Sequence, residues 1–193
     1  MDCEKIELEY FKYIDPSIKH KSVKNENSVR VIMARKQLKK YTDLIEAGWN
    51  KETILQTTTR LVKEILSKIG MRVPDDFNCV APVENKKVDY ETIVSSVHLE
   101  NKNDIVWIKL NTNGCISVVG TSRDISFSNR TEKKTSSGKI NTHLHQEWDK
   151  SKVLIFPLIN IPKELNRSDV ESIVGNYLTD HDIPILDFFS HRY

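Results

Sequence analysis

Two acidic residues and a lysine near the middle of the chain form the pattern best suited to chemistry. Asp89 is followed by Glu100 and, two positions later, by Lys102. Two carboxylates can hold Mg²⁺ beside a phosphate that is to be cleaved, and a lysine can steady the attacking water. We therefore expect Asp89 and Glu100 to be metal ligands, and all three residues to be catalytic.

This pattern resembles the motif of the PD-(D/E)xK nucleases, in which an acid is followed further along the chain by an acid-x-Lys triplet. The expected order of elements also resembles that nuclease core in outline. The resemblance covers three residues, and Val88 stands where the family has proline. It implies a Mg²⁺-dependent nuclease, which we expect to belong to a bacterial defence or mobile-element system. The Lys, Asn and Ile content suggests an AT-rich, bacterial source. The alternative is a polar hairpin turn around Glu100 and Lys102.

A second signal is the concentration of basic residues in the N-terminal third. Residues 16–72 hold 13 Lys and Arg residues against five acidic residues, although the formal net charge of the whole chain is only +2. Cations that neutralise phosphates bind DNA or RNA without reading its sequence. The alternative is a solvated helical face. The candidate contacts are Arg35, Lys36, Lys39, Lys40, Lys133 and Lys134, with Lys19, Lys21, Lys24 and Arg30 preceding them on the basic segment.

Histidines provide a third, weaker candidate. His143 and His145 lie close to Glu147 and Asp149, and these side-chain types can ligate a metal. Histidines two positions apart share a face only on a strand, whereas the surrounding pattern predicts a helix. Surface histidines are the alternative interpretation.

The N-terminal part, residues 1–72, is predicted to be helical. A short helix is expected over residues 3–14. Apolar residues then recur with a helical period from Ser28 to Ile69, interrupted at Gly48-Trp49-Asn50. Glycine is suited to ending one helix, and asparagine to capping the next. The pattern predicts two antiparallel helices within residues 28–69.

The apolar period changes to that of strands near residue 90. Runs at 93–99, 105–110, 115–120 and 124–127 predict an antiparallel meander, with a hairpin turn at Asn113-Gly114. The run at 105–110 is apolar on both faces except at Lys109, so it is expected to be a central strand.

Less regular patterns follow in the last third of the chain. Residues 128–139 are polar and lack periodicity, which predicts a mobile loop. Ile140, Leu144 and Trp148 lie four positions apart, and this spacing predicts a short helix. A buried strand is expected at 153–156, a helix opened by a capping box at residues 168–171, and a final strand at 185–189.

Together these elements predict one α+β domain spanning residues 1–193. It comprises an N-terminal helical hairpin, an antiparallel β-meander and a C-terminal β-α-β unit, with residues 88–193 forming one mixed sheet.

Composition limits the environment that we expect for the chain. It has no apolar run of about 18 residues, so no membrane-spanning helix is predicted, and it has no visible signal peptide. Three separated cysteines favour free thiols and a cytoplasmic location. Two function classes stay open: a nucleic-acid-directed protein, which would be an enzyme if the nuclease hypothesis holds, and a non-catalytic domain that binds or regulates a protein partner.

Overall fold

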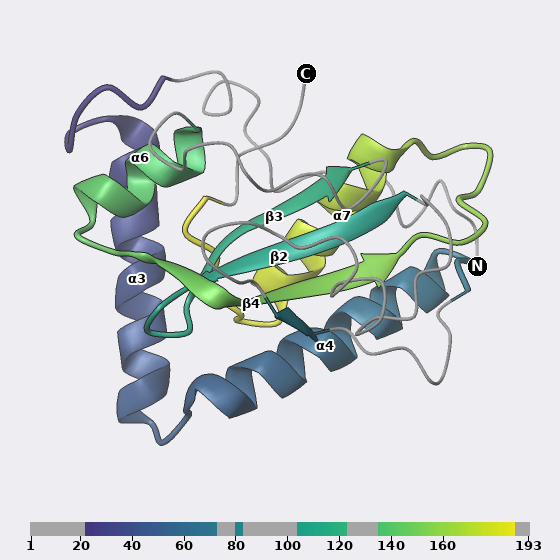
Figure 1. The fold of residues 1–193 in the computed structure, drawn as a ribbon, viewed down its shortest axis with the longest axis horizontal. Helices are drawn as coiled ribbons and strands as arrows, with labels where there is room; N and C mark the ends of the chain where they lie inside the picture. The colour runs from purple at the N-terminus through teal and green to yellow at the C-terminus, as the bar shows by residue number, and fades with distance from the viewer. Residues whose placement is uncertain (1–21, 73–79, 83–103, 123–134, 188–193) are drawn as a thin grey trace.

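The computed structural model describes residues 22–72, 80–82, 104–122 and 135–187. Within these residues, helices precede, interrupt and follow an antiparallel sheet, which confirms the predicted α+β class (Figure 1). The elements in chain order are α3 (Val29–Glu46), α4 (Lys51–Lys68), β1 (Val80–Pro82), β2 (Ile105–Asn111), β3 (Ile116–Ser122), α6 (Ser136–His143), β4 (Trp148–Pro157) and α7 (Arg167–Asp180).

The four strands follow the order β1-β4-β2-β3, and every neighbouring pair is antiparallel. In the middle of the sheet, Val106 of β2 pairs with Thr121 of β3 on one side and with Phe156 of β4 on the other. The expectation that residues 105–110 form a central strand is therefore confirmed.

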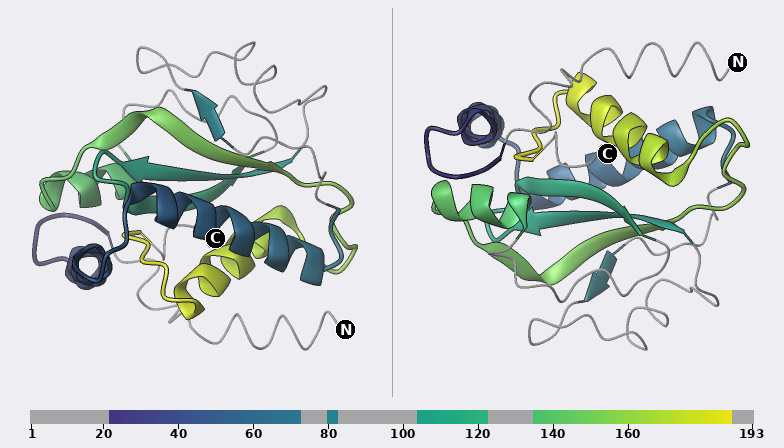
Figure 2. Two further views of the ribbon diagram at one scale, coloured as in Figure 1. Left: turned by 90° about the horizontal axis from the view of Figure 1, so that it is seen from below. Right: turned by 90° about the horizontal axis from the view of Figure 1, so that it is seen from above.

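Two helices cover one face of this sheet. Figure 2 shows α4 and α7 on the same side of the strands, where they also pack against each other. Leu61 and Ile65 of α4, Ile173 of α7 and Ile108 of β2 are almost fully buried in the larger of two apolar clusters. The continuous apolar run of β4, residues 153–156, is also buried, as its composition predicts.

The hairpin between β2 and β3 turns at Asn113-Gly114, as predicted. Gly114 has φ 95°, a left-handed conformation that favours glycine. A Cβ atom at this position would lie only 2.7 Å from Cγ of Lys51, so space also favours glycine. The end of the hairpin therefore packs closely against Lys51, the first residue of α4.

The two N-terminal helices have the expected ends but a different arrangement. Gly48 has φ 96°, and the Asn50 side chain accepts a hydrogen bond from the Thr53 backbone N–H at 2.9 Å, which caps α4. The predicted antiparallel packing is wrong: α3 is seen end-on where α4 extends across the view (Figure 2). The two helices do not bury their apolar stripes against each other. Most of the stripe of α4 packs on the sheet, whereas α3 packs against α6.

Three local expectations in the last third need correction. Residues 136–139, expected at the end of a loop, form the first turn of α6 because the Thr135 hydroxyl caps the Gly138 N–H. This helix ends at His143, so Trp148 belongs to β4 instead. The capping box of α7 is formed by Asn166 and Asp169 and not by residues 168–171.

The expected final strand is also absent from the described residues up to 187. Ile185 makes a single parallel bridge to Ile116 of β3, and the segment then continues without forming a strand. The described sheet is therefore antiparallel and not mixed. Residues 188–189, like the expected strands at 93–99 and 124–127 and the helix at 3–14, lie outside the described residues.

Candidate nucleic-acid interface

The residues of the nuclease hypothesis lie outside the described part of the chain. This applies to Asp89, Glu100 and Lys102, and also to two expected nucleic-acid contacts, Lys133 and Lys134. Within the described ranges, no group of three or more His, Cys, Asp or Glu side chains could hold a metal ion. The predicted Mg²⁺ site therefore remains a prediction.

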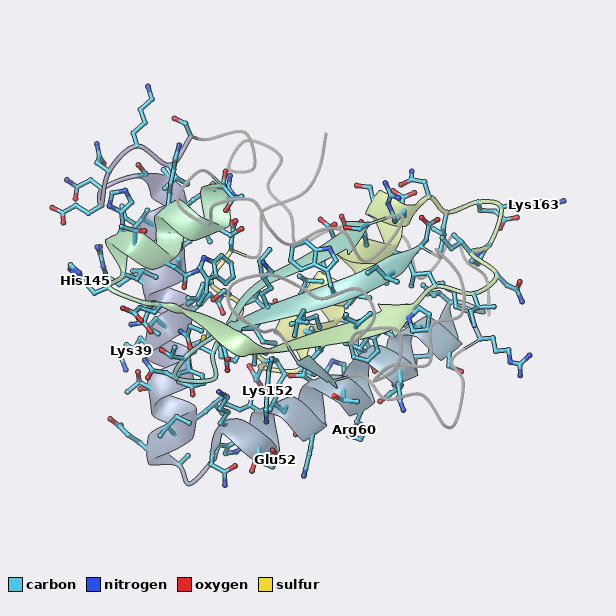
Figure 3. The ribbon with its side chains drawn as sticks, in the orientation of Figure 1. Lys39, Glu52, Arg60, His145, Lys152 and Lys163 are labelled. Atoms are coloured by element: carbon cyan, nitrogen blue, oxygen red, sulfur yellow. The ribbon has the colours of Figure 1, made fainter. Side chains whose placement is uncertain are left out.

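The other four expected nucleic-acid contacts lie together on α3. Arg35, Lys36, Lys39 and Lys40 are all exposed. Each pair separated by four residues, Arg35 with Lys39 and Lys36 with Lys40, forms a column along the helix with a rise of about 6 Å. In Figure 3, Lys39 lies at the edge of the molecule, away from the sheet. The outer side of α3 thus presents two short columns of positive charge to solvent, which we call the basic face.

The opposite side of α3 is firmly packed. Val31 and Ala34 are fully buried, and they share a small apolar cluster with Ile140 of α6. The Tyr41 hydroxyl donates a hydrogen bond to the backbone carbonyl of Asn113, at the hairpin turn. Burial raises the pKa of Tyr41, so this hydroxyl keeps its proton and remains a donor. The basic face is therefore presented by a helix with a defined orientation.

Arg30, which sequence alone groups with the basic residues, has a different role. Its guanidinium is buried and contacts the Asp187 carboxylate at 2.6 Å. Asp187 also accepts a hydrogen bond from the Ser137 hydroxyl at 2.7 Å. Burial raises the pKa of Asp187, while the neighbouring Arg30 opposes the shift. This cation holds the fold together and does not contribute to the basic face.

Three of the four cations of the basic face form no ion pair with the described residues, and the same is true of other basic side chains such as Lys63 and Lys163. Arg35, Lys36 and Lys40 form no ion pair there, whereas Lys39 contacts Asp43 at 2.8 Å, which raises the pKa of Lys39. Elsewhere, Lys51, Arg60, Lys68 and Arg167 each contact a carboxylate. Unpaired cations keep their field available to an anionic ligand.

The histidine candidates are not brought together as ligands. His143 is the last residue of α6, and His145 follows with φ 54° and an exposed side chain (Figure 3). Asp149, the acid expected beside them, contacts Lys51 at 2.5 Å. The surface interpretation of these histidines fits this geometry.

No protein-family model, curated protein or solved structure matches the chain. Within the described helices, none is long and apolar enough to cross a membrane. The basic face of α3 is therefore interpreted from its own chemistry.

Proposed function

We propose that this protein binds nucleic acid through the sugar-phosphate backbone, using the basic face of α3. The observation that supports the proposal is the exposure of Arg35, Lys36, Lys39 and Lys40 on one helix whose other side is buried. A cation on a fixed helix loses little conformational freedom of the backbone when it binds, so more of its attraction contributes to affinity. Backbone contacts of this kind carry no sequence information by themselves.

The spacing of the charges suits a regular array of phosphates. The two columns extend about 6 Å along the helix axis, and phosphates in one strand of B-form DNA recur about every 3.4 Å along the duplex axis. Each column therefore spans about two phosphate steps, and the four cations together can neutralise at most four phosphates. The Lys39–Asp43 contact must open for Lys39 to take part, and an exposed ion pair of this type is weak and easily broken.

A second candidate function is supported by apolar residues on the same helix. Val29, Ile32 and Ile45 are 42%, 41% and 38% exposed, and Asp43 and Glu46 add negative charge beside Ile45 near the end of α3. Exposed apolar residues next to charges of both signs are typical of protein contacts. A protein partner is therefore the alternative ligand for α3.

Salt-dependent binding measurements distinguish these two ligands. We expect the full-length protein to bind labelled duplex DNA or RNA at low salt, with log K falling against log salt with a slope of about −3 to −4. Lys36→Glu should weaken binding severalfold. The matched control is Lys163→Glu, which reverses an exposed lysine on the other side of the view in Figure 3 and should change affinity little.

Single-stranded probes of the same length show whether the duplex is required. Equal loss of affinity in the Lys36 and Lys163 variants would show that the binding surface is not centred on α3. No binding at low salt would reject the proposed function and favour the protein partner.

A further inference from the structure

Residues 183–187, which follow α7, lie between the two apolar clusters of the described structure. Ile183 and Ile185 belong to the larger cluster with the sheet, α4 and α7, whereas Leu186 belongs to the smaller cluster with α3 and α6. The segment is also attached to β3, because the Leu186 N–H donates to the Ile116 carbonyl and the Asp187 N–H to the Ser117 carbonyl, both at 2.9 Å. We call residues 183–187 the strap.

The strap ends in a buried polar network that reaches both helices of the smaller cluster. Asp187 contacts Arg30 of α3 at 2.6 Å and Ser137 of α6 at 2.7 Å. The Ser117 hydroxyl of β3 donates to the Asn141 side chain, and that side chain donates to the Ser137 carbonyl. Five polar residues from four separate segments of the chain therefore meet where α3, α6, β3 and the strap converge.

The ion pair in this network is buried but incompletely satisfied. Arg30 and Asp187 are 5% and 2% exposed, so removing either one leaves a buried charge without compensation. The Arg30 Nε atom has no hydrogen-bond partner among the described residues, although it too is buried. A buried network that leaves a donor unpaired is less stable than a complete one. The Arg30–Asp187 contact is therefore suited to a junction between α3 and the strap that can open as well as close.

We propose that the strap regulates the basic face: with Asp187 seated on Arg30, α3 is fixed and binds nucleic acid, and release of Asp187 loosens α3 and weakens binding. This inference rests on the proposed function, because it concerns the same face. A loosened helix must be ordered again when the ligand binds, which reduces affinity. By reciprocity, nucleic acid bound to α3 favours the seated strap.

Hydrogen exchange and binding measurements on the full-length protein test this coupling. In Asp187→Asn, amides of α3 and of the strap should exchange roughly a hundredfold faster, while the hairpin of β2 and β3 keeps its protection. Affinity for duplex should fall roughly fivefold with an unchanged salt slope, because no phosphate contact is removed. Asp104→Asn is the matched control, since it neutralises a partly exposed carboxylate that contacts Arg167.

A milder variant keeps the test decisive if Asp187→Asn fails to fold. Ser137→Ala removes one hydrogen bond to Asp187 and leaves its ion pair, so it should produce the same changes at smaller size. Unchanged hydrogen exchange in α3 would contradict the proposed role of the strap. Faster exchange in α3 with unchanged affinity for duplex would contradict it as well. Absence of nucleic-acid binding by the unmodified protein would instead overturn the proposed function and the regulatory role with it, while exchange alone would still decide whether the strap holds α3.

Discussion

The Tyr177 hydroxyl donates a hydrogen bond to the Glu64 carboxylate at 2.7 Å and thereby joins α7 to α4. Lys68 completes a triangle, because its ammonium contacts Glu64 at 2.7 Å and the Tyr177 oxygen at 2.8 Å. The two helices that cover the sheet are thus connected by a polar contact above their apolar interface. These three groups give the described fold a dependence on pH that can be measured.

Acid should weaken the fold through Glu64. Hydrogen bonds from Lys68 and Tyr177 lower the pKa of Glu64 from 4.5 to about 2. A carboxylate whose pKa is lower in the folded protein contributes stability above its unfolded pKa, and this contribution is lost as pH falls through the folded pKa. Between pH 4.5 and about 2, thermal unfolding midpoints should therefore fall less steeply in Glu64→Gln than in the unmodified protein.

The matched control for this prediction is Glu52→Gln. It removes a carboxylate from the first turn of the same helix, and Glu52 accepts a hydrogen bond from Gln56 without reaching α7. Identical pH profiles for Glu64→Gln and the unmodified protein would show that Glu64 does not link proton binding to folding.

Packing on the other face of the sheet makes Gly120 sensitive to added volume. A Cβ atom at Gly120 of β3 would lie 2.3 Å from the indole ring of Trp107 on the neighbouring strand. Gly120→Ala should therefore destabilise the protein by about 1–3 kcal/mol, as overpacking does elsewhere. Denaturant unfolding measures the change. Adding Trp107→Phe should recover part of the loss because a smaller ring frees space, and strictly additive effects of the two substitutions would contradict this contact.

The nuclease hypothesis requires its own test because its residues lie outside the described structure. If Asp89 and Glu100 hold Mg²⁺, the protein should cleave DNA or RNA only when Mg²⁺ is supplied, and alanine at either acid should abolish cleavage. Circular dichroism would show that both variants remain folded. Glu164→Ala, which removes an exposed acid, is the control and should stay active. If the unmodified protein shows no metal-dependent cleavage, the nuclease hypothesis is rejected. Nucleic-acid binding by the basic face of α3 is then the remaining proposal.

Local sequence signals predicted the elements that they specify directly. Asn50 is followed by a helical apolar period and caps α4, and Asn113-Gly114 lies between two runs rich in β-branched residues and forms the hairpin turn. Exposure of Lys36 and its basic neighbours also followed from their position opposite or beside the apolar side of α3. In each case a few adjacent residues contain the whole signal.

Features that depend on distant residues could not be predicted in this way. Arg30 and Asp187 are separated by 157 positions, and nothing near either residue marks the other as its partner. Sequence alone therefore placed Arg30 with the solvent-exposed cations. The direction of α3 relative to α4 was missed for a similar reason, since α3 packs against α6, which begins 90 positions after α3 ends.

The acidic residue on the basic face gives a prediction of opposite sign to the lysine substitution. Asp43 contacts Lys39 at 2.8 Å, and both side chains are more than half exposed. Asp43→Asn should release Lys39 and remove local repulsion of phosphates, so affinity for nucleic acid should rise about two- to fivefold at low salt. High salt should erase the gain because it screens exposed charges. Glu164→Gln, a neutralisation of the same size on another part of the surface, should have little effect. If Asp43→Asn weakened binding, the contact with Asp43 would be positioning Lys39 for the ligand, and competition between Asp43 and phosphates for Lys39 would be excluded.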